Sequence, residues 1–163
     1  MAVSDLPVFE NAEAVKNFLA PLRQLGKKVV TTNGCFDIIH AGHIQYLSEA
    51  ASLGDLLVVG INSDSSVRML KGPSRPLQSE IDRATVMAAL KMVSASFIFN
   101  QADPRTFLDI IKPEIHVKGG DYTADIIEAP TVQSYGGKVA IVSFREGYST
   151  SRIVEKIKNH LNT

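Results

Sequence analysis

Residues 31–43 constrain the fold more than any other stretch, because they join the end of an apolar strand to the start of a helix. His40 and His43 are spaced so that both imidazoles lie on one face of a helical turn. Gly42, between them, lets another group approach the backbone closely. A helix start also presents unpaired N–H groups and the positive end of the helix dipole. The stretch therefore predicts a site for an anion such as a phosphate.

Two other interpretations of this stretch have to be weighed. A single histidine is more often a surface or core residue than a functional one, and a glycine in a turn can serve packing alone. A zinc site is also conceivable, but two histidines are too few ligands, and Cys35 is the only cysteine in the chain. Both histidines occur together with the polar residues 33–37 in a strand–turn–helix setting, which favours the anion site.

The pattern that follows predicts an α/β fold. An apolar stripe over residues 44–51, a helix-ending Gly54 and a continuous apolar run over 56–61 together indicate a strand–helix–strand unit. Further strands are expected at 96–99, 115–118 and 139–142, with helical patterns between them. We therefore expect a doubly wound, Rossmann-like parallel sheet of about five strands.

Two helices at the ends of the chain carry more specific expectations. Pro21 is expected to kink or shorten the helix over residues 11–25. The last helix is expected to open with the hydroxyl run at 148–151 and to bury four apolar side chains, namely Ile153, Val154, Ile157 and Leu161.

Composition limits the class of protein. The 163 residues suit one domain, and 17 basic and 17 acidic residues leave no net charge that would attract nucleic acid generally. One cysteine excludes an internal disulfide, and no signal peptide or membrane-spanning apolar run is apparent. We expect a cytoplasmic protein without a nucleic-acid or membrane partner.

Polar clusters are expected at the carboxyl edge of the sheet, where open α/β sheets bind ligands. They are residues 33–43, 62–66 with Lys71, 118–121 and 148–151. The loop over 71–76 carries two cations and is either a solvated connector or a phosphate-binding loop. Arg83 falls in the first turn of a helix, where it either pairs with an anion or carboxylate or extends along the surface.

Several common nucleotide and hydrolase motifs are absent. The sequence contains no dinucleotide fingerprint, no P-loop and no Gly-x-Ser-x-Gly elbow. Histidine, lysine, arginine and hydroxyl donors around an anion site, without an evident protein nucleophile, favour direct phosphoryl-type transfer, in which the protein positions the reactants and neutralises charge.

These motifs resemble a known family. Gly34-Cys35-Phe36-Asp37-x-x-His40-x-Gly42-His43 resembles the signature of the cytidylyltransferase-like nucleotidyltransferases, and residues 149–151 resemble their second signature. Residues 59–68, 70–76, 117–122 and 146–151 are similar to the D-glycero-D-manno-heptose 1-phosphate adenylyltransferases within that superfamily. The resemblance covers about residues 27–161.

The resemblance implies a single nucleotidyltransferase domain over 1–163, with an accessory helix at 1–26 and a catalytic core at 27–161. It implies that a heptose 1-phosphate attacks the α-phosphate of ATP and gives ADP-heptose, a lipopolysaccharide inner-core precursor, and pyrophosphate. Mg²⁺ would accompany ATP, a separate sugar kinase would act upstream, and the protein would form a homo-oligomer. The alternatives are a cytidylyltransferase for another small phosphate acceptor, such as glycerol 3-phosphate, and an inactive nucleotide-binding module.

Matching positions assign roles to individual residues. The resemblance implies catalytic roles for His40, His43 and Lys71. It implies nucleotide binding by Asn33, Gly34, Cys35, Phe36, Gly42, Asp121, Tyr148, Ser149, Thr150 and Ser151. It implies substrate binding by Asp37, Asp64, Arg75, Arg83, Lys118 and Gly119, and it names no protein ligand for a metal. Lys71 is expected in a mobile loop, whereas Lys118 is expected mainly to shape the pocket.

Two positions depart from the family pattern. Phe144 stands where the superfamily has an arginine ahead of the second signature, and Arg145 follows one residue later. Ala129-Pro130 also interrupts an expected plain helix start, which leaves acceptor contacts around 125–135 open.

Overall fold

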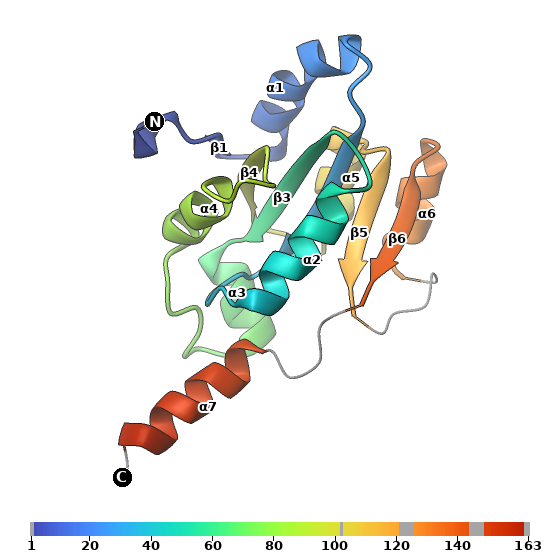
Figure 1. Cartoon of the computed structure of the whole chain (residues 1–163). Coiled ribbons are helices and arrows are strands. Elements are labelled where there is room, and N and C mark those ends of the chain that lie inside the picture. Colours follow the sequence, from blue (N-terminus) through green and yellow to red (C-terminus); the bar gives the residue numbers. More distant parts are fainter. Residues whose placement is uncertain (1, 102, 121–125, 144–148, 162–163) are drawn as a thin grey trace.

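The computed structural model describes residues 2–101, 103–120, 126–143 and 149–161. A parallel sheet of six strands in the order β1-β4-β3-β2-β5-β6 forms its centre (Figure 1). The strands are β1 (Val8–Phe9), β2 (Val29–Gly34), β3 (Leu56–Asn62), β4 (Ala95–Phe99), β5 (Ile115–Gly119) and β6 (Lys138–Val142). The helices are the 3-10 turn η1 (Val3–Asp5), α1 (Ala12–Gln24), α2 (Ala41–Ala51), α3 (Asp64–Lys71), α4 (Glu80–Ala88), α5 (Arg105–Ile111), α6 (Ala129–Ser134) and α7 (Thr150–Leu161).

The expected doubly wound α/β fold is confirmed, and the sheet has one strand more than the expected five or so. The additional strand is β1, which lies at the edge and pairs with β4 through Val8 and Phe9. Two residues are too short a run to show an alternating apolar pattern, so this strand left no periodic signal in the sequence.

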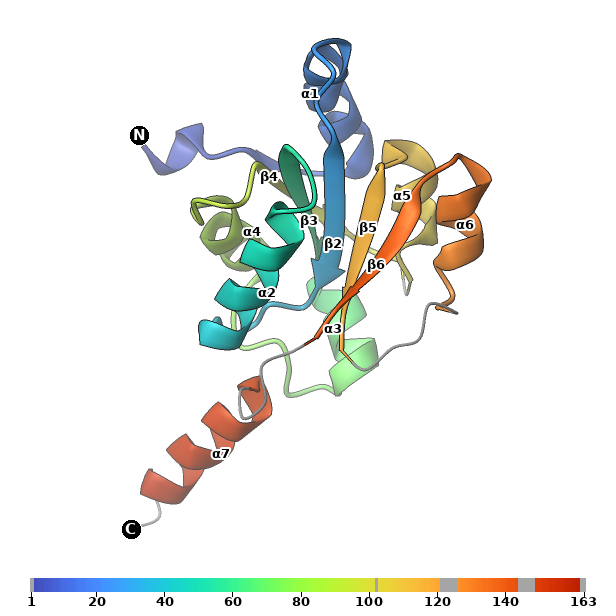
Figure 2. The same cartoon turned by 45° about the vertical axis from the view of Figure 1, so that its right-hand side comes forward.

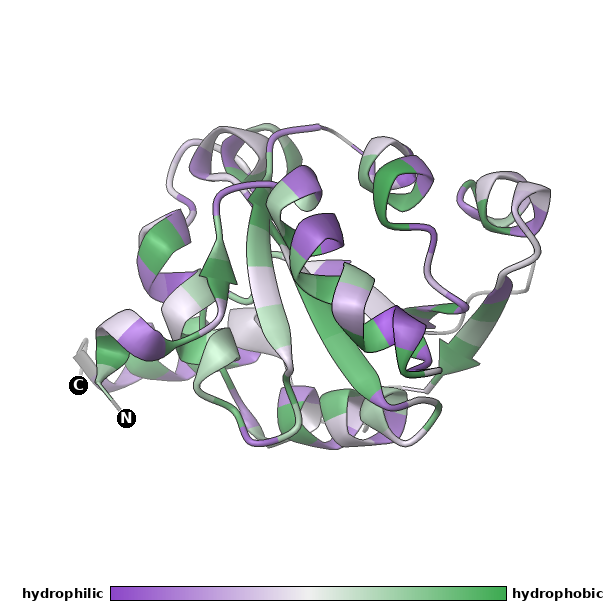
Figure 3. Ribbon diagram, turned by 90° about the horizontal axis from the view of Figure 1, so that it is seen from above, coloured by the Kyte–Doolittle hydropathy of each residue, from purple (hydrophilic) through white to green (hydrophobic). Residues whose placement is uncertain are grey.

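Side chains that alternate along the strands build one hydrophobic cluster on each face of the sheet. Val30 of β2 packs in a cluster with Leu47 of α2 and Met87 of α4. Its neighbour Val29 packs on the opposite face with Leu19 of α1 and other residues of α5 and α6. Helices therefore cover both faces, and hydrophobic residues concentrate on the strands in the middle of Figure 3.

Two helix boundaries differ from expectation near the N-terminus and the site. Pro21 lies inside the last turn of α1 and does not shorten it, because the helix continues to Gln24. Lys71 was expected in a loop, but it is the last residue of α3. Gly72 follows with a φ of 94°, a conformation that glycine adopts without strain, and it ends the helix there.

Helix α7 does not lie on the sheet but extends away from the body of the protein (Figures 1 and 2). Ile153 and Val154 are half-buried, whereas Ile157 is 52% exposed, so the prediction that the helix buries Ile157 was wrong. An amphipathic stripe indicates which side of a helix is apolar, but it does not show that the chain itself covers that side. The Leu161 side chain falls outside the described residues.

Across the described ranges, no helix combines the length and the apolar character that crossing a membrane requires.

Candidate active site

The carboxyl ends of β2 and β5 border a cavity of about 500 Å³, which the starts of α2 and α7 and the end of α3 complete. Figure 2 shows these elements meeting at one end of the sheet. The lining residues are Asn33, Gly34, Cys35, Phe36, Asp37, His40, His43, Tyr46, Val67, Lys71, Arg75, Lys118, Gly119, Ser149, Thr150 and Ser151. Most of the residues that were expected to form the site therefore line this one cavity.

Some expected site residues lie elsewhere, and two residues that line the cavity were not predicted from the sequence. Gly42, Asp64 and Arg83 do not line the cavity. Asp121 and Tyr148 lie outside the described residues, so their expected roles remain predictions. Tyr46 and Val67 were not anticipated. Tyr46 follows His43 by three residues on α2, and this spacing could have placed it on the same face.

The two histidines stack against each other at the start of α2. Their ring centroids are 3.8 Å apart and their planes differ by 18°. His40 is the N-cap residue of the helix, and its Nδ1 accepts a hydrogen bond of 3.3 Å from the His43 backbone N–H. The edge of Phe36 meets His43 with ring centroids 5.3 Å apart. The expectation that both imidazoles occupy one face of a helical turn is confirmed.

Burial keeps these histidines neutral. Burial, together with a smaller effect of the neighbouring His40, lowers the pKa of His43 to about 4. Burial also lowers the pKa of His40. His43 Nδ1 is buried and has no hydrogen-bond partner among the described residues. Near pH 7 the pair therefore presents neutral imidazoles, each able to donate one hydrogen bond, rather than two cations.

The turn before α2 has a constrained backbone. Phe36 has a φ of 47°, in the left-handed region that non-glycine residues seldom adopt. A Cβ atom at Gly34 would lie 3.0 Å from the Phe36 ring, so a larger residue there would force the ring to shift. The ring in turn packs against His43. Gly34 and Phe36 thus help to fix the histidine pair.

Asp37 fastens the loop after α3 to this turn. Its carboxylate is 2% exposed and accepts hydrogen bonds from Arg75 Nε at 2.6 Å and from the backbone N–H groups of Leu77 and Gln78 at 2.8 and 3.0 Å. Burial raises the pKa of Asp37, but the two backbone donors and Arg75 outweigh it, and the net pKa is lowered. Arg75 lines the cavity with its charge already paired to this carboxylate.

Arg83 lies inside the protein and joins the ends of two strands. It is 1% exposed and donates hydrogen bonds to the carbonyl oxygens of Cys35 at 2.6 Å and Asn62 at 2.8 Å. It also donates to Asp64 Oδ1 at 2.8 Å and to the Gln78 carbonyl at 3.1 Å. Of the alternatives for this arginine, pairing with a carboxylate is confirmed and the surface position was wrong.

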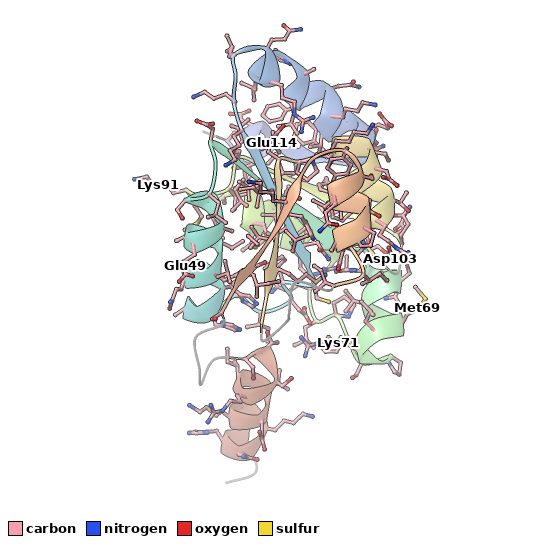
Figure 4. The ribbon with its side chains drawn as sticks, turned by 90° about the vertical axis from the view of Figure 1, so that its right-hand side faces the viewer. Glu49, Met69, Lys71, Lys91, Asp103 and Glu114 are labelled. Atoms are coloured by element: carbon pink, nitrogen blue, oxygen red, sulfur yellow. The ribbon has the colours of Figure 1, made fainter. Side chains whose placement is uncertain are left out.

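The two lysines of the cavity differ in their partners. Lys118, at the end of β5, donates a hydrogen bond to Glu128, which is almost completely buried. Lys71 is exposed, and no carboxylate among the described residues lies within ion-pair distance of it. Figure 4 shows Lys71 at the end of α3, while Met69 of the same helix points away from the body. Lys71 thus carries a positive charge that a bound anion can pair with.

The hydroxyl run closes the cavity at the start of α7. Ser149 Oγ accepts a hydrogen bond of 3.2 Å from the Arg152 backbone N–H, as an N-cap residue does. Thr150 Oγ1 donates to the Ile38 carbonyl oxygen at 3.2 Å and so connects α7 to the turn before α2. Ser151 lines the cavity next to them.

The described residues do not fit a magnesium ion held by the protein. Among them, no group of three or more His, Cys, Asp and Glu side chains could hold a metal. Both Asp37 oxygens already accept hydrogen bonds, which makes this cavity carboxylate a poor metal ligand.

Comparison with known proteins identifies the family. The family model described as cytidylyltransferase-like matches residues 31–158. The bifunctional protein HldE of Syntrophotalea carbinolica is 48% identical over 146 residues, which are 89% of this chain and 30% of that protein. The corresponding protein of Campylobacter jejuni subsp. doylei is 49% identical over 144 residues, 88% of this chain and 31% of that protein. The chain thus spans less than a third of the curated relatives it matches.

A solved structure agrees with these matches. The lipopolysaccharide core biosynthesis protein from Thermoplasma volcanium GSS1 is 32% identical and superposes with a TM-score of 0.61, over 76% of this chain and 100% of that one. The family match covers both signatures, and the histidine pair, the turn before α2 and the start of α7 lie together in the cavity wall. The chain therefore belongs to the cytidylyltransferase-like family of nucleotidyltransferases.

Proposed function

We propose that this chain transfers the adenylyl group of ATP to D-glycero-D-manno-heptose 1-phosphate, giving ADP-heptose and pyrophosphate for lipopolysaccharide inner-core synthesis. The observation that carries the proposal is the pair of stacked, neutral histidines in a cavity that Lys71 also lines. The relatives named HldE and the structural neighbour named for lipopolysaccharide core biosynthesis support the heptose acceptor. They give no support to the alternative of a glycerol 3-phosphate cytidylyltransferase.

The reaction is a direct displacement at phosphorus. An oxygen of the acceptor phosphate forms a bond to the α-phosphorus of ATP, and the bond from that phosphorus to the bridging oxygen breaks. The electron pair of the broken bond leaves on pyrophosphate. No covalent intermediate with the protein is needed, so the protein contributes positioning and charge stabilisation.

The cavity residues fit these two tasks. His40 and His43 donate hydrogen bonds to the triphosphate oxygens, on which negative charge develops, and Lys71 balances part of that charge. Backbone N–H groups of residues 33–36 and the hydroxyls of 149–151 hold the nucleotide. Asp37, Arg75 and Arg83 act mainly on the shape of the site, because their charged groups already bind one another or other protein groups.

Several further elements belong to the same proposal. Mg²⁺ would accompany ATP and balance part of the triphosphate charge, since the described residues offer no cluster of ligands for it. A sugar kinase activity supplies the heptose 1-phosphate, in keeping with the relatives named bifunctional. The protein works in the cytoplasm as a homo-oligomer, a dimer or larger.

A substrate panel tests the proposal. Purified protein is mixed with ATP, CTP, GTP or UTP and with either anomer of heptose 1-phosphate or with glycerol 3-phosphate, and pyrophosphate release is measured. We expect release only with a heptose 1-phosphate, and faster with ATP than with CTP. Faster release with CTP, or release with glycerol 3-phosphate alone, would contradict the proposed function.

A further inference from the structure

Glu128 is a charged residue inside the protein, directly behind the cavity wall. It is 1% exposed and stands at the N-cap position of α6. Its side chain makes no capping hydrogen bond to that helix. One carboxylate oxygen, Oε1, instead accepts a hydrogen bond from Lys118 Nζ. The carboxylate is therefore directed toward β5 and the cavity, and not toward its own helix.

The ion pair runs from the interior to the cavity wall. The Lys118 side chain is 22% exposed and lines the cavity, whereas the Glu128 side chain is 2% exposed and does not line it. The second carboxylate oxygen, Oε2, is buried and has no hydrogen-bond partner within the described part of the chain. Glu128 can therefore influence a bound ligand through Lys118, but it does not contact one directly in this arrangement.

The pair changes what Lys118 can offer to a ligand. A lysine ammonium has three N–H donors on a flexible four-carbon chain. Glu128 accepts from one donor and so fixes the direction of the other two. A lysine that is already ordered loses less conformational freedom when a ligand binds, and donors oriented in advance stabilise an anion without rearrangement. Lys71 has no comparable ion pair among the described residues.

We propose that Glu128 is a positioning residue that holds the Lys118 ammonium at the cavity wall, oriented toward the phosphate groups of the bound substrate. The proposal rests on the proposed function for the identity of the ligand, a polyphosphate. It also assigns the pair a division of roles, in which Lys118 contacts phosphate and Glu128 acts only through Lys118.

A double-mutant cycle tests this division, with inorganic pyrophosphate as the probe and calorimetry as the measurement. The proteins are the unmodified chain, Glu128→Gln, Lys118→Ala and the double variant. We expect Glu128→Gln to weaken pyrophosphate binding about tenfold and Lys118→Ala to weaken it at least as much. The double variant should bind no more weakly than Lys118→Ala alone, because the effect of Glu128 requires Lys118.

Glu114→Gln is a matched control for the charge change. Glu114 stands directly before the first residue of β5, at the other end of the strand from Lys118. It accepts a hydrogen bond of 2.7 Å from the Val29 backbone N–H and pairs with Arg23. Figure 4 places it at the other end of the protein from Lys71. Its substitution should leave pyrophosphate affinity within about twofold, as expected for sites that share no partners.

Three results would overturn the proposal. They are unchanged affinity in Glu128→Gln, unchanged affinity in Lys118→Ala, and a loss from Glu128→Gln that is equally large when Lys118 is absent. Thermal unfolding shows whether each variant folds, and Glu128→Asp takes the same place in the cycle if Glu128→Gln does not fold. Because pyrophosphate binding is measured without an acceptor, lack of turnover with heptose 1-phosphate contradicts the proposed function and leaves this test intact.

Discussion

His40 and His43 stack their imidazole rings 3.8 Å apart at the start of α2, and burial keeps both rings neutral. Two cations could not share this position without strong repulsion, so the neutral state and the stacked geometry support each other. The pair therefore provides hydrogen-bond donors to a phosphate, while positive charge comes from Lys71 and Lys118. Substitution of a histidine should therefore remove a hydrogen-bond donor, whereas substitution of a lysine should remove a positive charge.

The first prediction concerns the protonation of His43. Its pKa is about 4 in the folded protein and about 6.5 in the unfolded chain. Between these values the unfolded state binds more protons, so the free energy of unfolding falls as the pH is lowered from about 6.5 to 4. A shift of this size corresponds to about 3 kcal/mol from His43 alone. A histidine NMR titration should give a midpoint near 4 for His43. A midpoint near the ordinary value would show that the ring is not buried in solution.

The second prediction separates catalysis from binding at His43. His43→Ala should lower kcat by about 10²–10³, as loss of one oriented donor typically does, with little change in KM for ATP. Steady-state kinetics provide the test. His160→Ala is the matched control, because His160 is exposed on α7. A kcat within about threefold of the unmodified protein, together with a raised KM, would make His43 a binding residue only.

The third prediction concerns the exposed lysine of the cavity. Lys71→Ala should lower kcat/KM for ATP by about 10²-fold or more, because it removes a positive charge that pairs with phosphate. Its stability should change by less than about 0.5 kcal/mol, because Lys71 is exposed and has no ion-pair partner among the described residues. Lys91→Ala should affect neither quantity, because Lys91 is exposed, does not line the cavity and lies well apart from Lys71 in Figure 4. A large loss of stability in Lys71→Ala would show that the side chain has a structural role.

The fourth prediction concerns the stability contribution of Lys118. Lys118→Ala leaves the Glu128 carboxylate buried without its partner. Breaking a buried ion pair typically lowers the free energy of unfolding by about 3–5 kcal/mol, and the loss should be somewhat smaller here because Lys118 is partly exposed. Adding Glu128→Gln should restore part of that loss. Urea unfolding measures both effects. The kinetic effect should be smaller than that of Lys71→Ala, and a larger loss of kcat/KM in Lys118→Ala would contradict this order.

Local sequence patterns predicted the parts of the site that one segment builds alone. The apolar run before residue 33, the spacing of His40 and His43, and the hydroxyls at 149–151 each depend on neighbours within a few residues. Contacts between distant segments could not be predicted in this way. Arg83 reaches the Cys35 carbonyl across 48 positions of the chain, and only the packed fold brings them together.

Other features depend on how the elements pack. The pattern of α7 correctly indicates an apolar side, but Ile157 is exposed because the helix extends away from the sheet. Lys118 and Glu128 belong to different elements and have no recognisable spacing, so their pairing could not be read from the sequence. The glycine and prolines of residues 72–76 are typical of a loop, and they gave no sign that α3 continues as far as Lys71.

The last prediction decides between two roles for Arg83, contact with the acceptor phosphate and support of the cavity wall. Its guanidinium already donates to the Cys35 and Asn62 carbonyls and to Asp64, and it is 1% exposed. Arg83→Lys keeps the charge but replaces a planar group with several donors by a single ammonium, so some of these acceptors lose their partner.

We therefore expect Arg83→Lys to lower the free energy of unfolding by about 2–4 kcal/mol, since each buried acceptor left unpaired costs about 1–3 kcal/mol. The KM for the acceptor should change less than kcat, because the turn that carries Cys35 would shift with the histidine pair. Arg105→Lys, an exposed arginine paired with Asp103, is the control and should change neither stability nor kinetics appreciably. Unchanged stability together with a selectively raised acceptor KM would instead show that Arg83 contacts the acceptor phosphate.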